Sequence, residues 1–179
     1  MKVQKTPLQD ALILEPRVFA DERGFFLESY SERTFTELGI SERFVQDNHS
    51  FSKRGVLRGL HYQITKPQGK LVRVVSGEIL DVLVDLRRSS PSFGRWYSIR
   101  LSGENHLLAW IPAGFAHGFH VLSENAHVLY KSTDFYFPEF ERTILWNDPD
   151  LAIEWNAKAP VLSAKDKRGV YLRDAEVFD

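Results

Sequence analysis

The sequence predicts an all-β fold, either a sandwich or a barrel of short strands. Short runs rich in β-branched and aromatic residues follow one another along the chain, and turn residues separate them. Only one segment has a clear helical pattern, and there is no repeat, linker or low-complexity stretch. We therefore expect one domain over residues 1–179, with a few short helices beside the strands.

The N-terminal part of the chain contains the one clear helix pattern, at Ser31–Gly39. Its first residue is a favourable N-cap, Phe35 and Leu38 would lie on one side, and its last residue is a closing glycine. The preceding segment, DERGFFLESY, begins with Asp-Glu-Arg-Gly. On local chemistry alone, this tetrapeptide is most simply a surface turn.

The central part of the chain predicts two hairpins. LRGLHYQ and KLVRVV would pair across the loop ITKPQG, which would bring His61 and Lys70 nearly opposite each other. A second hairpin is expected at Ser76-Gly77, within KLVRVVSGEILDVLVDLR. In its second run, apolar residues at even positions from Leu80 to Leu86 alternate with aspartates on the other face.

The C-terminal half continues the series with strands expected at Arg95–Ser102, Leu107–Pro112, Gly118–Ser123 and His127–Tyr136. The last two would pair across a turn at Glu124-Asn125. That pairing would bring Phe119 near Tyr130 and place His117 on the same face as Tyr130. Tyr136 would share this face, because it lies six residues further along the same strand. Two such tyrosines are ordinarily core or rim residues. The polar segment after Val161 is expected to form a short helix or turn and then an extended tail.

The composition limits the possible functions. A hydrophobic content of 43% and an aromatic content of 13% argue against disorder. The net charge of -1 gives no electrostatic basis for binding nucleic acid or a membrane surface. The absence of cysteine excludes disulfides and thiolate chemistry. The first apolar run is too short for a signal peptide, and no stretch approaches a membrane span. We therefore expect a soluble, cytoplasmic protein.

The stretch RGVLRGLHYQ, residues 54–63, has the pattern of a buried strand but carries two arginines and a histidine. Cations in such a strand indicate a pocket, with His61 as a base and Arg58 as an anion clamp. Strict alternation would send these two side chains to opposite faces, and a bulge at Gly59 could bring them together. For His61 and Lys70, the alternative is a sheet rim on which both point to water.

The stretch IPAGFAHGFHVLS resembles the second conserved motif of cupins, through Pro112-x-Gly114-x-x-His117, and Gly55, His61 and Gln63 fall near the first motif. This resemblance implies a cupin-type double-stranded β-helix, that is, a jelly-roll barrel. Glutamine stands where the second histidine ligand of cupins would be, and no glutamate follows in the expected region. Two histidines are too few for a metal site, so no metal is expected. For His117 alone, the alternative is a hydrogen-bonded core or turn histidine.

Five segments together extend the resemblance over nearly the whole chain, from about Arg17 to Asp166. They are DERGFFLES, FVQDNHSFSKRGVLRGLHYQ, GKLVRVVSGEILDVLVDLR, IPAGFAHGFHVLS and LSAKD. In order and spacing they resemble the dTDP-4-dehydrorhamnose 3,5-epimerase family. The resemblance implies inversion of C3 and C5 of dTDP-4-dehydro-6-deoxy-D-glucose, without metal or coenzyme. Both carbons are α to a ketone, so the chemistry needs a base, an acid on the opposite face and a cation for the enolate oxygen.

The resemblance also implies a role for each matching residue. His61 matches the base, Asp166 the carboxylate that orients it, Lys70 the cation near the C4 oxygen and Tyr130 the acid. The expected substrate contacts are Arg23, Phe26, Glu28, Gln46, Asp47, Asn48, Arg58, His117, Tyr136, Glu141 and Lys165. Among these, the arginines suit the pyrophosphate, the aromatic residues suit the base, and Glu28 suits an acceptor for thymine.

The resemblance implies a homodimer in which the DERGFFLES segment reaches the neighbouring site. That would account for Phe25 and Phe26 standing together in a surface turn. Three alternatives remain open. A related enzyme would epimerise only one carbon or move the ketone. A non-catalytic nucleotide-sugar binding module would not need His61, Tyr130 and Asp166 together. A metal-dependent cupin oxygenase would need the metal that the ligand pattern does not predict.

Overall fold

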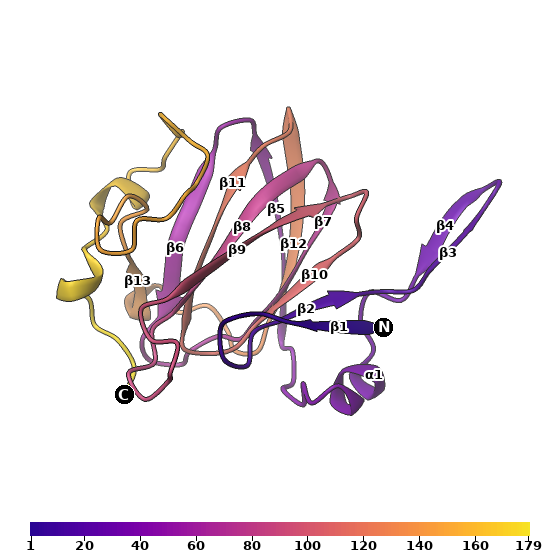
Figure 1. Ribbon diagram of the computed structural model, residues 1–179, viewed down its shortest axis with the longest axis horizontal. Helices are drawn as coiled ribbons and strands as arrows, with labels where there is room; N and C mark the ends of the chain where they lie inside the picture. Colours follow the sequence, from indigo (N-terminus) through magenta and orange to yellow (C-terminus); the bar gives the residue numbers. More distant parts are fainter.

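The structure, a computed structural model, describes residues 1–179 and consists mostly of β-strands (Figure 1). Two antiparallel sheets of six and five strands enclose the core, and a two-stranded hairpin stands apart from them. The six-stranded sheet has the order β1 (Lys2–Lys5), β2 (Leu12–Glu15), β10 (Leu108–Ile111), β7 (Lys70–Ser76), β12 (Asn125–Ser132) and β5 (Gln46–Lys53). The five-stranded sheet has the order β13 (Glu141–Thr143), β6 (Leu57–Gln63), β11 (Phe115–Val121), β8 (Glu78–Asp85) and β9 (Trp96–Ser102). The prediction of an all-β fold is confirmed.

The connections between strands correspond to the predicted jelly roll. Apart from the β8–β9 hairpin, successive strands from β5 to β12 lie in opposite sheets. Three expected hairpins are therefore wrong: β6 does not pair with β7, β7 does not pair with β8, and β11 does not pair with β12. Instead, the turn at Ser76-Gly77 carries the chain from one sheet to the other. The same turn residues suit a hairpin within one sheet and a connection between two sheets. Only the pairing with distant strands distinguishes the two arrangements.

The expected helix is α1, over Glu32–Glu37, and this prediction is confirmed. The side chain of Ser31 accepts a hydrogen bond from the backbone N–H of Thr34, as an N-cap does. Gly39 ends the segment with a φ of +85°, a conformation that favours glycine. Three short 3-10 helices follow later in the chain: η1 (Pro138–Phe140), η2 (Asp166–Arg168) and η3 (Leu172–Asp174).

The apolar core has three parts. The largest lies between the two sheets and includes Val72 of β7 and Phe119 of β11. A second cluster covers the outer face of the five-stranded sheet, where the C-terminal segment packs (Figure 1). It contains the predicted alternating apolar residues, which are Leu80, Val82 and Val84 of β8 and Leu86 directly after it. The third lies on the outer face of the six-stranded sheet and includes Phe35 of α1. Both faces of each sheet are thus covered over part of their area.

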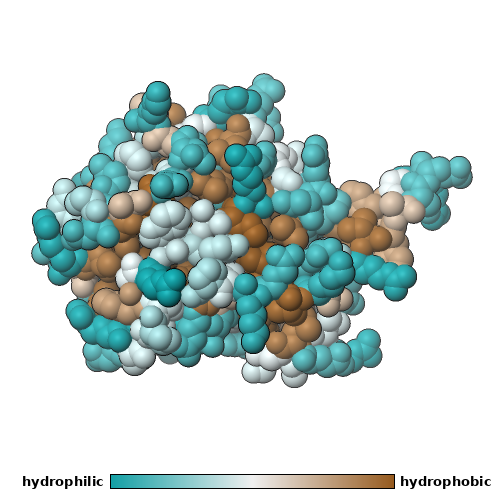
Figure 2. Space-filling view, viewed as in Figure 1, coloured by the Kyte–Doolittle hydropathy of each residue, from teal (hydrophilic) through white to brown (hydrophobic).

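The β3 (Val18–Asp21) and β4 (Gly24–Leu27) hairpin projects from the body of the molecule (Figure 1). Figure 2 shows an apolar area on this projection behind a hydrophilic tip. Phe25 is 59% exposed and Phe26 is 69% exposed. An exposed aromatic pair of this size is typical of a surface that contacts another molecule.

No helix of the protein is long and apolar enough to cross a membrane.

Candidate active site

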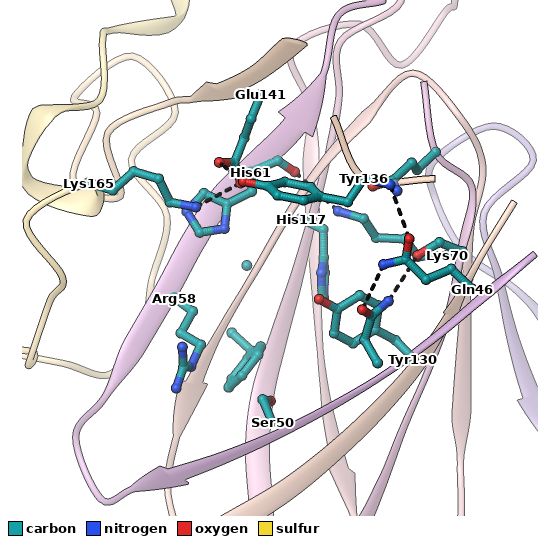
Figure 3. A pocket seen from close by; sticks show the side chains of 15 residues that line it. Gln46, Ser50, Arg58, His61, Lys70, His117, Tyr130, Tyr136, Glu141 and Lys165 are labelled. Carbon is teal, nitrogen blue, oxygen red and sulfur yellow. Dashed lines mark hydrogen bonds and ion pairs between the residues drawn. The ribbon is translucent and has the colours of Figure 1, made fainter. Parts of the chain in front are cut away.

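A cavity of about 310 Å³ opens between the two sheets, and polar side chains line most of it (Figure 3). Its wall includes residues from β5, β6, β7, β11 and β12, together with side chains from loops. Most of the residues predicted from the sequence lie here. They are Gln46, Asn48, Arg58, His61, Lys70, His117, Tyr130, Tyr136, Glu141 and Lys165.

His61, half-buried in the cavity wall, forms a hydrogen bond with the buried carboxylate of Asp166. The His61 Nε2 atom lies 2.6 Å from Asp166 Oδ1. Burial alone would raise the pKa of Asp166, but hydrogen bonds from His61 and Ser163 lower it to about 2. The carboxylate is therefore ionised and accepts the Nε2 proton of His61, which leaves Nδ1 free as a base. Burial lowers the pKa of His61, so its imidazole is neutral at neutral pH.

A bulge in β6 brings Arg58 and His61 to the same cavity. Arg58 pairs with Phe119, and His61 pairs with His117. Two residues of β6 thus stand opposite Gly118 alone, which is a bulge at the position where the sequence allowed one. Gly59 has a φ of +118°, and a Cβ atom there would lie 2.5 Å from the Gly118 Cα atom. The strand can carry the bulge only because this position has no side chain.

Lys70 is buried at the start of β7, with only 8% of its surface exposed. Its Nζ atom donates to the backbone oxygen of His61, 3.4 Å away. The two residues lie in different sheets, so this contact crosses the inside of the sandwich rather than a hairpin. Burial lowers the pKa of Lys70 to about 8, while Glu141 and Asp81 oppose that effect. At neutral pH most of the population keeps the cation.

Tyr130 lies on β12, in the sheet opposite that of His61. Both side chains line the cavity, and Figure 3 shows them on different sides of it. Burial raises the pKa of the Tyr130 hydroxyl, so this group keeps its proton at neutral pH. The cavity thus has a neutral base from one sheet and a protonated phenol from the other.

His117 has a carboxylate partner of its own, which the sequence did not reveal. Its Nε2 atom lies 2.7 Å from Oδ1 of Asp81, a residue with no exposed surface. The other oxygen, Asp81 Oδ2, is buried without a hydrogen-bond partner. The negative charge of Asp81 also favours the cationic form of Lys70. The available signal was an aspartate in the middle of an apolar strand, but nothing in the local pattern identified its partner.

The rim of the cavity is built from three separate segments. Glu141 accepts hydrogen bonds from Tyr136 Oη at 3.0 Å and from Lys165 Nζ at 2.7 Å. Tyr136 does not lie on the strand of Tyr130 as expected, because β12 ends at Ser132. The loop that follows nevertheless returns Tyr136 to the same cavity.

Arg58 spans the space between the sheets. Its Nε atom donates to Ser52 Oγ at 3.0 Å, and Nη2 donates to the Phe51 oxygen at 3.3 Å. These bonds hold one edge of the guanidinium group against β5. The Nη1 group forms no bond with β5 and can donate to an anion in the cavity.

The side chains of the predicted QDN segment, residues 46–48, point to two different faces of β5. Gln46 and Asn48 face the cavity, as does Ser50. Asp47 faces the other way and pairs with Lys131, at 2.9 Å between Nζ and Oδ1. Successive residues of a strand point to opposite faces, so the structure does not bring the Asp47 side chain to the cavity.

Arg23, Phe26 and Glu28 are also absent from the cavity of their own chain. The first two belong to the projecting β3–β4 hairpin, where Arg23 pairs with Asp21 at 2.6 Å. Glu28 follows the hairpin and accepts a hydrogen bond from Thr34 Oγ1 at 2.9 Å. A single chain therefore does not unite these three residues with His61.

The histidines and acidic residues do not gather in a way that suits a metal ion. No group of three or more histidine, aspartate or glutamate side chains lies close enough together to hold one. His61 and His117 each direct one ring nitrogen to a carboxylate instead.

Comparison with known proteins points to a single family. The family model described as dTDP-4-dehydrorhamnose 3,5-epimerase matches residues 5–174. A protein of that name from Pseudomonas aeruginosa is 59% identical over 180 residues, which covers 99% of each chain.

Solved structures give the same result. A dTDP-6-deoxy-D-glucose-3,5-epimerase from Legionella pneumophila, in complex with dTDP-4-keto-L-rhamnose, superposes with a TM-score of 0.95 at 50% identity. The match covers 98% of this chain and 94% of the Legionella chain. A 3′-monoepimerase from Streptomyces bikiniensis is more distant, with a TM-score of 0.88 at 32% identity over 94% of this chain and 86% of its own.

Proposed function

The chain belongs to the dTDP-4-dehydrorhamnose 3,5-epimerase family, and on that basis we propose that its cavity carries out the family's reaction. The enzyme is an isomerase that converts dTDP-4-dehydro-6-deoxy-D-glucose into dTDP-4-dehydro-L-rhamnose. One observation carries the assignment: His61, Lys70 and Tyr130 border one cavity, His61 is paired with Asp166, and the base and the phenol come from opposite sheets.

His61 is the proposed base for both inversions. Its free Nδ1 atom takes the proton from C5 or C3, and the C–H electron pair passes into an enolate with C4. The pair with Asp166 stabilises the imidazolium that forms, through a charge-assisted hydrogen bond. Because the ketone itself stabilises the carbanion, the step requires no metal or coenzyme.

Lys70 is the proposed cation for the enolate oxygen. A buried ammonium acts in surroundings that water screens poorly, so its attraction for a developing anion is stronger than at the surface. The same burial lowers its pKa to about 8, which still leaves it charged at neutral pH.

Tyr130 is the proposed acid. A base that returned its own proton would restore the original configuration, so inversion needs a donor on the opposite face. The raised pKa of Tyr130 keeps the phenol protonated until the enolate accepts its proton. The resulting imidazolium and phenolate must then exchange protons with solvent before the second inversion.

We assign the nucleotide to the remaining polar side chains. Arg58 suits a pyrophosphate oxygen, and His117 suits the sugar or a phosphate. Gln46 and Asn48 supply amide groups beside the nucleotide, and Tyr136 supplies an aromatic face. Glu141 and Lys165 are proposed as peripheral contacts.

A homodimer would complete this site. The exposed phenylalanines of the projecting β3–β4 hairpin (Figure 1) and the absence of Arg23 from the lining of its own cavity support a hairpin that reaches a second copy of the chain. In such a dimer, Arg23, Phe26 and Glu28 would contact the nucleotide in the neighbouring site. The assignment of Asp47 as a contact rests on family resemblance alone. A cytoplasmic location stays a prediction from the sequence.

Incubation with dTDP-4-dehydro-6-deoxy-D-glucose in heavy water tests the proposal. Deuterium at both C3 and C5 of an inverted product, by NMR, is the expected result. Label at only one of the two carbons would identify a monoepimerase instead. Binding of dTDP without any exchange would indicate a non-catalytic module. His61→Ala is the control, because it should abolish exchange at both carbons while the protein still binds dTDP.

A further inference from the structure

Ser163 contacts the carboxylate that orients the proposed base. We propose that Ser163 is a positioning residue: its hydroxyl fixes the rotation of the Asp166 carboxylate, so that Oδ1 stays directed at His61. This inference rests on the proposed function, because it assigns a role to Ser163 within the same proton-transfer chemistry. Ser163 does not line the cavity, so it would act on the reaction only through Asp166.

The contacts of Asp166 divide between its two oxygens. Oδ1 accepts from His61 Nε2 at 2.6 Å and from the Gly59 N–H at 3.4 Å. Oδ2 accepts from Ser163 Oγ at 2.6 Å and from the Ser163 N–H at 3.3 Å. Both oxygens of a carboxylate that is 2% exposed are thus occupied, and one residue supplies both donors to Oδ2.

Ser163 and Asp166 bind each other reciprocally at the start of η2. The Ser163 hydroxyl accepts from the Asp166 N–H at 3.1 Å while it donates to the Asp166 side chain. This is the Ser-x-x-acid arrangement of a capping box, which fixes both a turn and a side chain. The sequence LSAKD contains it, and the acid of the box is the proposed partner of His61.

Asp166 needs this support because it does not belong to a strand. Its segment is joined to the start of β6 by a short parallel bridge, with Leu57 donating to Val161 at 3.0 Å and Val161 donating to Gly55 at 2.8 Å. That bridge ends five residues before Asp166. His61 and Gly59 bind only Oδ1, and without the hydroxyl only the 3.3 Å bond from the Ser163 N–H would hold Oδ2, so the carboxylate would turn more freely about its Cβ–Cγ bond. The Ser163 hydroxyl removes that freedom without adding a charge.

A pair of isosteric variants tests the role of the hydroxyl. Ser163 is exposed, so threonine and valine both fit without repacking the core. Ser163→Thr keeps the hydroxyl. Ser163→Val has the shape of threonine but carries a methyl group in place of the hydroxyl. We expect Ser163→Val and Ser163→Ala to lower kcat about tenfold or more with KM changed less than about twofold, and Ser163→Thr to stay within about threefold of wild type. Ser123→Ala is the matched control, because its hydroxyl also binds turn backbone groups but lies outside the cavity.

A second measurement does not depend on turnover. In Ser163→Val the Asp166 carboxylate loses a donor, so its pKa, followed by carbon NMR, should rise by about one unit relative to Ser163→Thr. The proposal is overturned if the Val and Thr variants share the same kcat and the same Asp166 pKa. A rise in KM alone would also overturn it. If the wild type lacks epimerase activity, the proposed function fails, and the NMR comparison still decides whether Ser163 holds Asp166.

Discussion

Replacement of Tyr130 by phenylalanine should separate proton removal from inversion. The ring stays in the wall of the cavity, and only the proposed proton donor is lost. Burial raises the pKa of the Tyr130 hydroxyl, the positive charge of Arg58 opposes that effect, and no hydrogen bond within the chain acts on the group. The unfolding free energy should therefore change by less than about 0.5 kcal/mol. Any large loss of activity would then reflect chemistry rather than folding.

The expected loss follows from the role of the acid. General acids contribute about 10²–10⁴-fold to the rate, or about 3–5 kcal/mol of transition-state stabilisation at ~1.4 kcal/mol per tenfold. His61 and Lys70 remain, so the enolate still forms. His61 then exchanges its proton with solvent and returns a deuteron to the same face. In heavy water, Tyr130→Phe should therefore label recovered starting material without inverting it.

The assay is NMR of the sugar after incubation of each variant in heavy water, with product and recovered substrate analysed separately. Tyr136→Phe is the matched control, since its hydroxyl borders the same cavity but donates to Glu141. It should invert both carbons, with its effect mainly on KM. Inversion by Tyr130→Phe at a rate near that of wild type would refute the assignment of the acid. A complete loss of exchange in this variant would contradict the assignment of proton removal to His61 and of proton donation to Tyr130.

Three other perturbations address the electrostatics and the bulge. The rate should fall through an apparent pKa of about 8 as Lys70 loses its proton. The unfolding free energy should rise between about pH 8 and 10.5, because the unfolded chain binds more protons there than the folded chain. Lys70→Met should abolish that rise, as measured by urea titrations. Asp81→Asn removes a charge that favours the Lys70 cation, so the alkaline limb of the pH–rate profile should move to lower pH; an unchanged limb would contradict the coupling. Gly59→Ala should lower the unfolding free energy by about 3 kcal/mol or more, because the alanine Cβ would meet Gly118 and the φ at this position is positive. A loss below about 1 kcal/mol would argue against a rigid bulge.

Local patterns predicted the elements of this fold better than their pairing. The Ser31 cap, the alternation within β8 and the glycine that permits the β6 bulge can each be recognised from a few neighbouring residues of the sequence. The three wrong hairpins share one cause. A turn such as Ser76-Gly77 bends the chain equally well within a sheet and between two sheets. Which occurs depends on partners far along the sequence, such as the pairing of β7 with β10 and β12.

The candidate site shows the same difference between local patterns and long-range pairing. His61 and Lys70 were expected to meet across a hairpin; they meet across the interior of the sandwich instead. Family resemblance named Asp166, whose carboxylate arrives from a segment 105 positions further along the chain. No local pattern could assign Asp81 to His117, because their contact joins two neighbouring strands that the sequence alone does not pair. The period-two alternation of β5 could have separated Asp47 from Gln46 and Asn48.

The proposed reaction requires that an imidazole and a phenol face one keto-sugar ring from its two sides. A crystal structure with a dTDP-linked 6-deoxy sugar that lacks the 4-keto group tests it directly, because this ligand cannot react. We expect His61 Nδ1 and Tyr130 Oη to lie within about 3.5 Å of C3 or C5, on opposite faces of the ring. A sugar bound with both groups on one face, or outside the reach of either, would contradict it.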